Sequence, residues 1–150
     1  MFKTIIWATD GSEAAERALP TALDLTAQAS GTLLVVHADA RLGGRASGVP
    51  MIADEEDVES KLRSKVNELV ESGIAASFRV IRGTAKDPAD LIAEVAREVD
   101  ADVIVVGTRG HGRVAGMLLG SVTQRLLHVA PCPVLAVPAK VAAAAGVGTS

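Results

Sequence analysis

Short apolar runs without polar alternation constrain the fold of this 150-residue chain more than any other feature. The clearest run is Val103-Ile104-Val105-Val106, and the segment Thr32–Ala38 is apolar in the same way on both faces. Strands of this kind are buried on both sides, as in parallel sheets that helices cover above and below. Segments with helical spacing alternate with the apolar runs, which supplies the crossovers that parallel strands need.

The alternation predicts five strands and four helices in one open, doubly wound α/β domain. The strands are expected at Phe2–Ala8, Thr32–Ala38, Ser77–Ile81, Asp102–Val106 and Val134–Val137. The helices are expected over Glu13–Ala29 with a kink at Pro20, from the acidic run Asp54–Asp57 in a first turn to Gly73, from Asp87-Pro88 onward, and from about Ser121 to Val129. With the first strand central, the predicted order is 3-2-1-4-5. Ligands of such folds bind beyond the carboxyl ends of the strands where the order reverses, here between strands 1 and 4.

Length and composition limit the classes of protein that this chain can represent. A chain of 150 residues fits one domain, expected over residues 1–138, and the small residues 139–150 are expected to form a flexible tail. With 2% aromatic residues and a net charge of −3, a nucleic-acid partner is not expected. Cys132 is the only cysteine, which favours a structural role in a reducing compartment. Neither a leader peptide nor a membrane span is expected, so we predict a cytoplasmic protein.

The stretch GTRGHGRVAGMLLGS, residues 107–121, follows the most apolar strand and has the composition of a phosphate-binding segment. All 18 acidic residues lie at or before Asp102, so this stretch falls in the acid-free part of the chain. Gly107 and Gly110 are expected to allow unusual backbone angles and close approach of a ligand. Gly120-Ser121 would begin a helix whose unpaired N–H groups attract an anion, and the hydroxyls of Ser121 and Thr123 would add donors. Glycines that only form tight turns are the alternative.

Two common nucleotide motifs do not account for this stretch. The chain has no Gly-Lys dipeptide, which excludes a P-loop. Residues 110–115, GHGRVA, match the dinucleotide fingerprint GxGxxA, but no acidic residue follows Asp102 to hold a ribose.

A third pattern, Gly-x2-Gly-x9-Gly-Ser, is met by Gly107, Gly110 and Gly120-Ser121. Together with Ala8–Ser12, residues 35–38 (VVHA), Gly83 and residues 131–137 (PCPVLAV), it resembles the universal stress protein family, in the branch that binds ATP. The resemblance covers about residues 2–138 and implies a Rossmann-like fold of the adenine nucleotide alpha hydrolase type. The loop Arg41–Val49 matches no pattern of the family.

The resemblance also implies the function and the positions of the ligand. It implies a stress-response regulator that binds ATP, or ADP, AMP or cAMP, with Mg²⁺ as a candidate companion ion of the nucleotide. The implied nucleotide-binding residues are Ala8, Thr9, Asp10 and Ala38 on the adenine and ribose side, Gly107, Arg109, Gly110 and His111 along the phosphates, and Gly120, Ser121, Val122 and Thr123 at the helix start. Asp10 is also consistent with a helix cap or with a ligand of nucleotide-bound Mg²⁺. The family further implies a homodimer joined through Val134–Val137, whose apolar edge would otherwise be exposed.

Binding of ATP does not imply hydrolysis, and we expect at most slow turnover. No acidic residue lies near Arg109, His111 and Arg113 in the sequence to serve as a base. His37, in an apolar strand, is expected to be a packed core residue, and His128 a surface or packing residue. The alternatives are a nucleotide-free dimeric interaction protein of the same fold and, less favoured, a hydrolase of ATP or phosphate esters.

Overall fold

The computed structural model describes residues 2–39, 51–82, 86–108 and 119–138, and the side chains of residues 51–54 are excepted. The strands are β1 (Thr4–Ala8), β2 (Thr32–Asp39), β3 (Ala76–Arg82), β4 (Val103–Gly107) and β5 (Val134–Val137). The helices are α1 (Glu13–Glu16), α2 (Leu19–Ala29), α3 (Met51–Glu71), α4 (Pro88–Glu98) and α5 (Ser121–Val129). The loop 41–49, Gly83 and the expected tail 139–150 lie outside the described residues.

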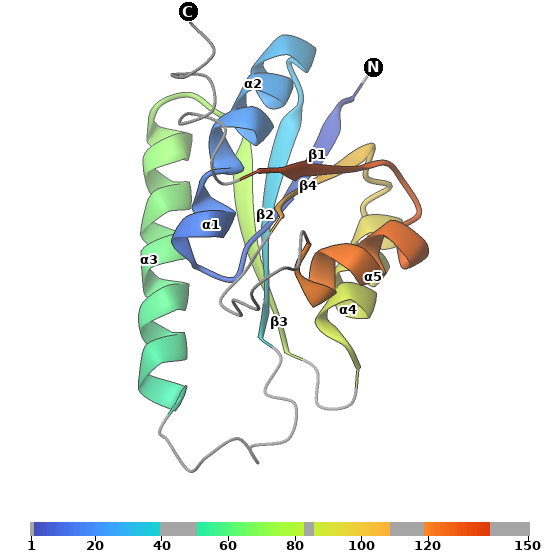
Figure 1. Cartoon of the computed structure of the whole chain (residues 1–150). Coiled ribbons are helices and arrows are strands. Elements are labelled where there is room, and N and C mark those ends of the chain that lie inside the picture. Colours follow the sequence, from blue (N-terminus) through green and yellow to red (C-terminus); the bar gives the residue numbers. More distant parts are fainter. Residues whose placement is uncertain (1, 40–50, 83–85, 109–118, 139–150) are drawn as a thin grey trace, which may run out of the picture.

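The five strands form one parallel sheet in the order β3-β2-β1-β4-β5, which confirms the predicted topology. Trp7 in the central strand β1 is in register with Val35 of β2 and Val105 of β4. Helices α1, α2 and α3 lie on one side of the sheet, and α4 and α5 lie on the other (Figure 1). From β1 the chain adds β2 and β3 on one side, and then returns to add β4 and β5 on the other side of β1. The strand order therefore reverses between β1 and β4, which confirms the predicted switch point.

Successive side chains of the central strands fill two separate core layers, because neighbouring strand residues point to opposite faces. Ile5, Trp7 and Val105 pack with residues of α2 and α3, among them Leu62. Ile6, Val36 and Ile104 belong to the layer that includes Ile92 of α4 and Leu126 of α5. This two-sided burial explains why the strand sequences lack polar alternation.

Two details of the helices differ from the expectation. Pro20 does not kink one continuous helix: α1 ends at Glu16 and α2 begins at Leu19, with Pro20 in its first turn. A proline is tolerated there because first-turn N–H groups have no intrahelical acceptor. Helix α3 begins at Met51, so of the acidic run only Asp54 lies in its first turn. The expectation that all four carboxylates stabilise that turn was wrong, because residues 51–53 continue the helix upstream.

Candidate functional site

The turn Thr9–Ser12, which follows β1, is held by short-range hydrogen bonds. The Gly11 N–H donates to Thr9 Oγ1 over 3.0 Å, and the Ser12 N–H donates to Asp10 Oδ1 over 2.9 Å. Ser12 is the N-cap of α1, and its Oγ accepts from the Ala15 N–H. Gly11 has a φ of +83°, a left-handed conformation that favours glycine. The cap role considered for Asp10 thus belongs to Ser12, and Asp10 orients the cap residue.

The end of β4 is joined directly to the start of α5. The Thr123 hydroxyl donates to the Gly107 carbonyl over 2.9 Å, and the Gly120 N–H donates to the Thr108 carbonyl over 2.6 Å. Trp7 is in register with Val105, so Thr9 and Gly107, two residues further along, lie at the same end of the sheet. The β1 turn, the end of β4 and the first turn of α5 therefore meet at the switch point.

Gly107 has a structural reason to be glycine that the sequence did not reveal. A Cβ atom on Gly107 would lie 2.7 Å from the Ala14 carbonyl oxygen, because α1 crosses β4 there. Among the described glycines only Gly11 and Gly73 have a positive φ. The expected unusual backbone angle at Gly107 was therefore wrong, and the close approach that this residue permits is that of a helix.

The first turn of α5 has the features of an anion site. Its N-cap, Gly120, has no side chain to accept from the turn, and no side-chain cap bond forms there. The main-chain N–H groups of Ser121, Val122 and Thr123 follow, and they have no carbonyl acceptor within the helix. The first intrahelical hydrogen bond is donated by the Gln124 N–H to the Gly120 carbonyl. Ser121 is exposed, but Thr123 is buried. Since the Thr123 hydroxyl donates to Gly107, it secures the helix start instead of offering a donor to a ligand.

The structure brings most of the implied nucleotide-binding residues together at the carboxyl end of the sheet. They are Ala8, Thr9 and Asp10 after β1, Ala38 in β2, Gly107 in β4, and Gly120, Ser121, Val122 and Thr123 at the start of α5. Ala38 is in register with Ile81 and packs toward α4 and α5. The remaining three, Arg109, Gly110 and His111, lie outside the described residues.

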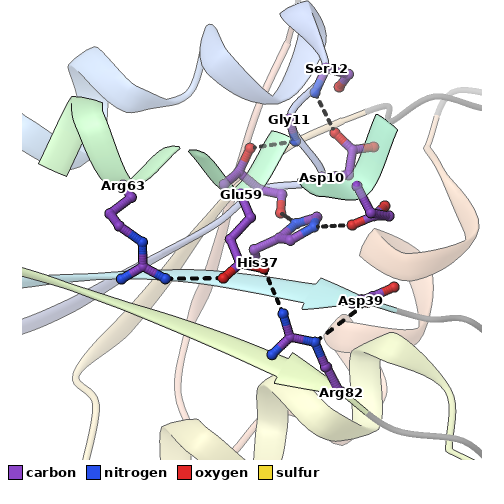
Figure 2. A network of polar contacts seen from close by, with 10 residues as sticks. Asp10, Gly11, Ser12, His37, Asp39, Glu59, Arg63 and Arg82 are labelled. Carbon is purple, nitrogen blue, oxygen red and sulfur yellow. Dashed lines mark hydrogen bonds and ion pairs between the residues drawn. The ribbon is translucent and has the colours of Figure 1, made fainter. Parts of the chain in front are cut away.

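His37 has a contact pattern that sequence reasoning missed. As expected it is buried, with 2% of its surface exposed, but both ring nitrogens are hydrogen-bonded. Nδ1 lies 2.9 Å from the Thr9 carbonyl oxygen, and Nε2 lies 2.8 Å from Glu55 Oε2 of α3 (Figure 2). A carbonyl only accepts, so Nδ1 carries a proton and donates to Thr9. The signal in the sequence was the pairing of a histidine within an apolar strand with an acidic run in the next helix.

A charged network surrounds this histidine at the ends of β2 and β3. Arg82 Nη2 lies 2.6 Å from Glu59 Oε2, and its Nε lies 3.9 Å from the buried carboxylate of Asp39. Glu59 Oε1 accepts from Arg63 over 3.0 Å (Figure 2). These contacts tie α3 to the edge of the sheet on the side of β3.

Other polar candidates have structural partners. Arg125, in the acid-free part of the chain, forms an ion pair with Asp90 of α4 at 3.0 Å, and hydrogen bonding to this carboxylate raises its pKa. Burial raises the pKa of the Cys132 thiol, and the Asp102 carboxylate adds to the effect, so Cys132 stays a thiol at neutral pH. His128 is exposed. Within the described part of the chain, no group of three or more His, Cys, Asp and Glu residues is placed to hold a metal ion.

The fold defines a class: an open doubly wound α/β protein in which a turn after β1 and the start of α5 lie at the switch point of the sheet. Comparison with known proteins identifies the family. The profile of the universal stress protein family matches residues 1–138. The protein named "Universal stress protein in QAH/OAS sulfhydrylase 3′region" of Thermus aquaticus is 38% identical over 146 residues, which span 91% of this chain and 99% of that protein. The chain belongs to the universal stress protein family.

Solved structures agree with this assignment. The chain is similar to a universal stress protein crystallised in complex with cAMP, with a TM-score of 0.69 and 27% identity over 92% of this chain and 98% of the other. It is also similar to the universal stress protein from Archaeoglobus fulgidus in complex with dAMP, with a TM-score of 0.66 and 27% identity over 91% and 97% of the two chains. Among the described residues, no helix combines the length and apolarity needed to cross a membrane.

Proposed function

We propose that this protein binds an adenine nucleotide, with ATP as the first candidate and ADP, AMP or cAMP as alternatives, between the carboxyl ends of β1 and β4. The observation that carries the proposal is that the Thr9–Ser12 turn and a helix start without a side-chain cap meet at the switch point of the sheet. Helix starts of this kind favour phosphate groups. The cAMP and dAMP complexes of two similar proteins support adenine nucleotides as the ligand class.

In the proposed site, one set of residues contacts the adenine and ribose, and another set contacts the phosphates. Thr9, Asp10 and Ala38 would contact the adenine and ribose. The main-chain N–H groups of α5 from Ser121 to Thr123 would bind the phosphates, together with the implied residues Arg109, Gly110 and His111. A Mg²⁺ ion would be held mainly by the phosphates of the nucleotide, with Asp10 as its protein ligand.

We assign the protein a regulatory role in the stress response, in the cytoplasm, with at most slow hydrolysis of ATP. Hydrolysis needs a group that orients water and charges that stabilise the leaving phosphate. Two titratable side chains described near the site form structural hydrogen bonds. The Asp10 carboxylate accepts from the Ser12 N–H, and the His37 ring is hydrogen-bonded to the Thr9 carbonyl and the Glu55 carboxylate. The protein is proposed to be a homodimer joined through β5. A nucleotide-free interaction protein and a slow phosphate-ester hydrolase are the competing functions.

Isothermal titration calorimetry of ligand-free protein with ATP, ADP, AMP and cAMP tests the proposal. We expect binding of at least one nucleotide with a dissociation constant in the micromolar range. Gly120→Val should abolish it, because the added side chain lies over the first turn of α5. The backbone at Gly120, with φ −68° and ψ 159°, is one that valine adopts, so the variant should fold.

Ser64→Val is the matched control, since Ser64 is exposed on α3 and is not among the implied nucleotide-binding residues. It should bind like the unmodified protein. If no nucleotide produces heat or raises the melting temperature, the interaction-protein alternative gains support. Normal binding by Gly120→Val would show that the phosphates lie elsewhere. Rapid release of phosphate in the same samples would favour the hydrolase.

A further inference from the structure

We propose that His37 is a positioning residue for the nucleotide site: its Nδ1–H fixes the Thr9 carbonyl, and Glu55 of α3 fixes the imidazole ring. This inference rests on the proposed function. It concerns His37 and Glu55, which hold the Thr9–Ser12 turn in place and do not contact the ligand themselves.

The main chain of Thr9 is fixed on both sides. Its N–H donates to the Val36 carbonyl over 3.0 Å, and its carbonyl accepts from His37 Nδ1 over 2.9 Å. Its hydroxyl accepts from the Gly11 N–H. Thr9 is 6% exposed, so these bonds are shielded from water and strongly direct the chain that leaves β1. The direction of that chain determines where Asp10 and the following turn lie.

Glu55 gives the imidazole a second fixed point. Nε2 and Glu55 Oε2, 2.8 Å apart, share one proton, since a bare ring nitrogen and a carboxylate would repel each other. The bond joins α3 to the end of β2, while the Thr9 bond joins β2 to the turn after β1. His37 thus connects helix α3 to the Thr9–Ser12 turn on the proposed adenine side of the site (Figure 2).

Two amide variants separate the two contacts of His37. The side-chain nitrogen of asparagine occupies the place of Nδ1, so His37→Asn retains the donor to Thr9 and loses the bond to Glu55. Glutamine places its nitrogen near Nε2, so His37→Gln retains the bond to Glu55 and loses the one to Thr9. Each variant buries one amide and loses one contact, which makes them matched controls for each other.

The experiment measures nucleotide affinity by calorimetry and melting temperature for both variants. We expect His37→Asn to bind within about threefold of the unmodified protein, and His37→Gln to bind about tenfold more weakly, the effect of one buried hydrogen bond. His37→Leu, which has no donor, should also bind about tenfold more weakly, even if its apolar side chain makes it the more stable fold. Affinity that follows the melting temperature across the three variants would overturn the proposal, as would normal binding by His37→Gln.

Hydrogen exchange without nucleotide distinguishes this inference from the proposed function. The N–H groups of Gly11 and Ser12 should exchange faster in His37→Gln than in His37→Asn, because the turn loses its anchor. The Gly31 N–H, bonded to the Thr26 carbonyl at the end of α2, is the internal reference. If the unmodified protein binds no nucleotide, the proposed function fails, and the exchange rates alone decide whether His37 positions the turn. Equal exchange in both variants would overturn the positioning role.

Discussion

Asp102 shows how one carboxylate can secure the start of a central strand. It lies just before β4, and its Oδ2 accepts from the N–H groups of Lys3 and Thr4 at the start of β1, each over 2.8 Å. These two main-chain hydrogen bonds lower the pKa of Asp102. The ionised form is therefore favoured in the folded state, and Asp102 joins the amino ends of two neighbouring strands.

The first prediction at the scale of residues concerns this carboxylate. A pKa that is lower in the folded than in the unfolded state contributes stability above the unfolded value, about 3.9 for aspartate. The contribution disappears as the pH falls through the folded value. Asp102→Asn should therefore lower the melting temperature by a few degrees at neutral pH, and the difference should shrink in acid below about pH 4. Thermal unfolding of both proteins over a pH series measures this, and a difference that grows in acid would contradict it.

At the scale of elements, the short helix α1 depends on contacts with two strands. Gly107 of β4 lets its main chain approach, and Trp7 Nε1 of β1 donates to the Ala15 carbonyl over 3.1 Å. Trp7 is the only tryptophan and is fully buried. Four residues cannot form a stable helix alone, so these contacts hold α1 beside the proposed site.

Gly107→Ala tests this dependence. The added Cβ would meet main-chain atoms of α1, which cannot rotate away as a side chain can, so we expect a loss of about 1–3 kcal/mol in the free energy of unfolding. Trp7 fluorescence should change as α1 is displaced. Gly73→Ala is the control, because its Cβ would meet nothing within 4 Å. Only the strain of its positive φ should lower the free energy of unfolding, and Trp7 emission should stay unchanged. Urea unfolding followed by fluorescence measures both, and equal Trp7 spectra in all three proteins would contradict the prediction.

Elements with a strong local signal could be predicted from the sequence. The apolar runs Val103–Val106 and Thr32–Ala38 indicated the central strands, and Asp87-Pro88 indicated the start of α4, whose cap is indeed Asp87. The strand order was predicted correctly, and the proposed position of the site rests on it. The His37–Glu55 contact could not be predicted, because it depends on how α3 lies over β2. The Thr123 hydroxyl bond and the role of Gly107 depend likewise on packing between elements distant in the sequence.

At the scale of the whole molecule, the two edges of the sheet differ in how they are covered. Edge strand β3 contacts α3, which extends along that side of the sheet (Figure 1). At the other edge, Leu135 of β5 is 39% exposed, and Leu127 of the neighbouring α5 is 53% exposed. An apolar edge strand favours pairing with another chain. This exposure supports the proposal that two copies associate through β5.

Leu135→Glu should therefore convert the proposed dimer to a monomer, because association would bury a carboxylate at an apolar contact. Light scattering after size-exclusion chromatography gives the mass of each species. Val70→Glu is the matched control, since Val70 is 50% exposed on α3, the helix that contacts the opposite edge strand β3. This variant should have the mass of the unmodified protein. Calorimetry of the monomeric variant adds a second result: the proposed site is built from one chain, so nucleotide affinity should stay within about threefold. A Leu135→Glu protein with the mass of the unmodified dimer would exclude β5 as the interface, and a monomer without nucleotide binding would show that the partner chain completes the site.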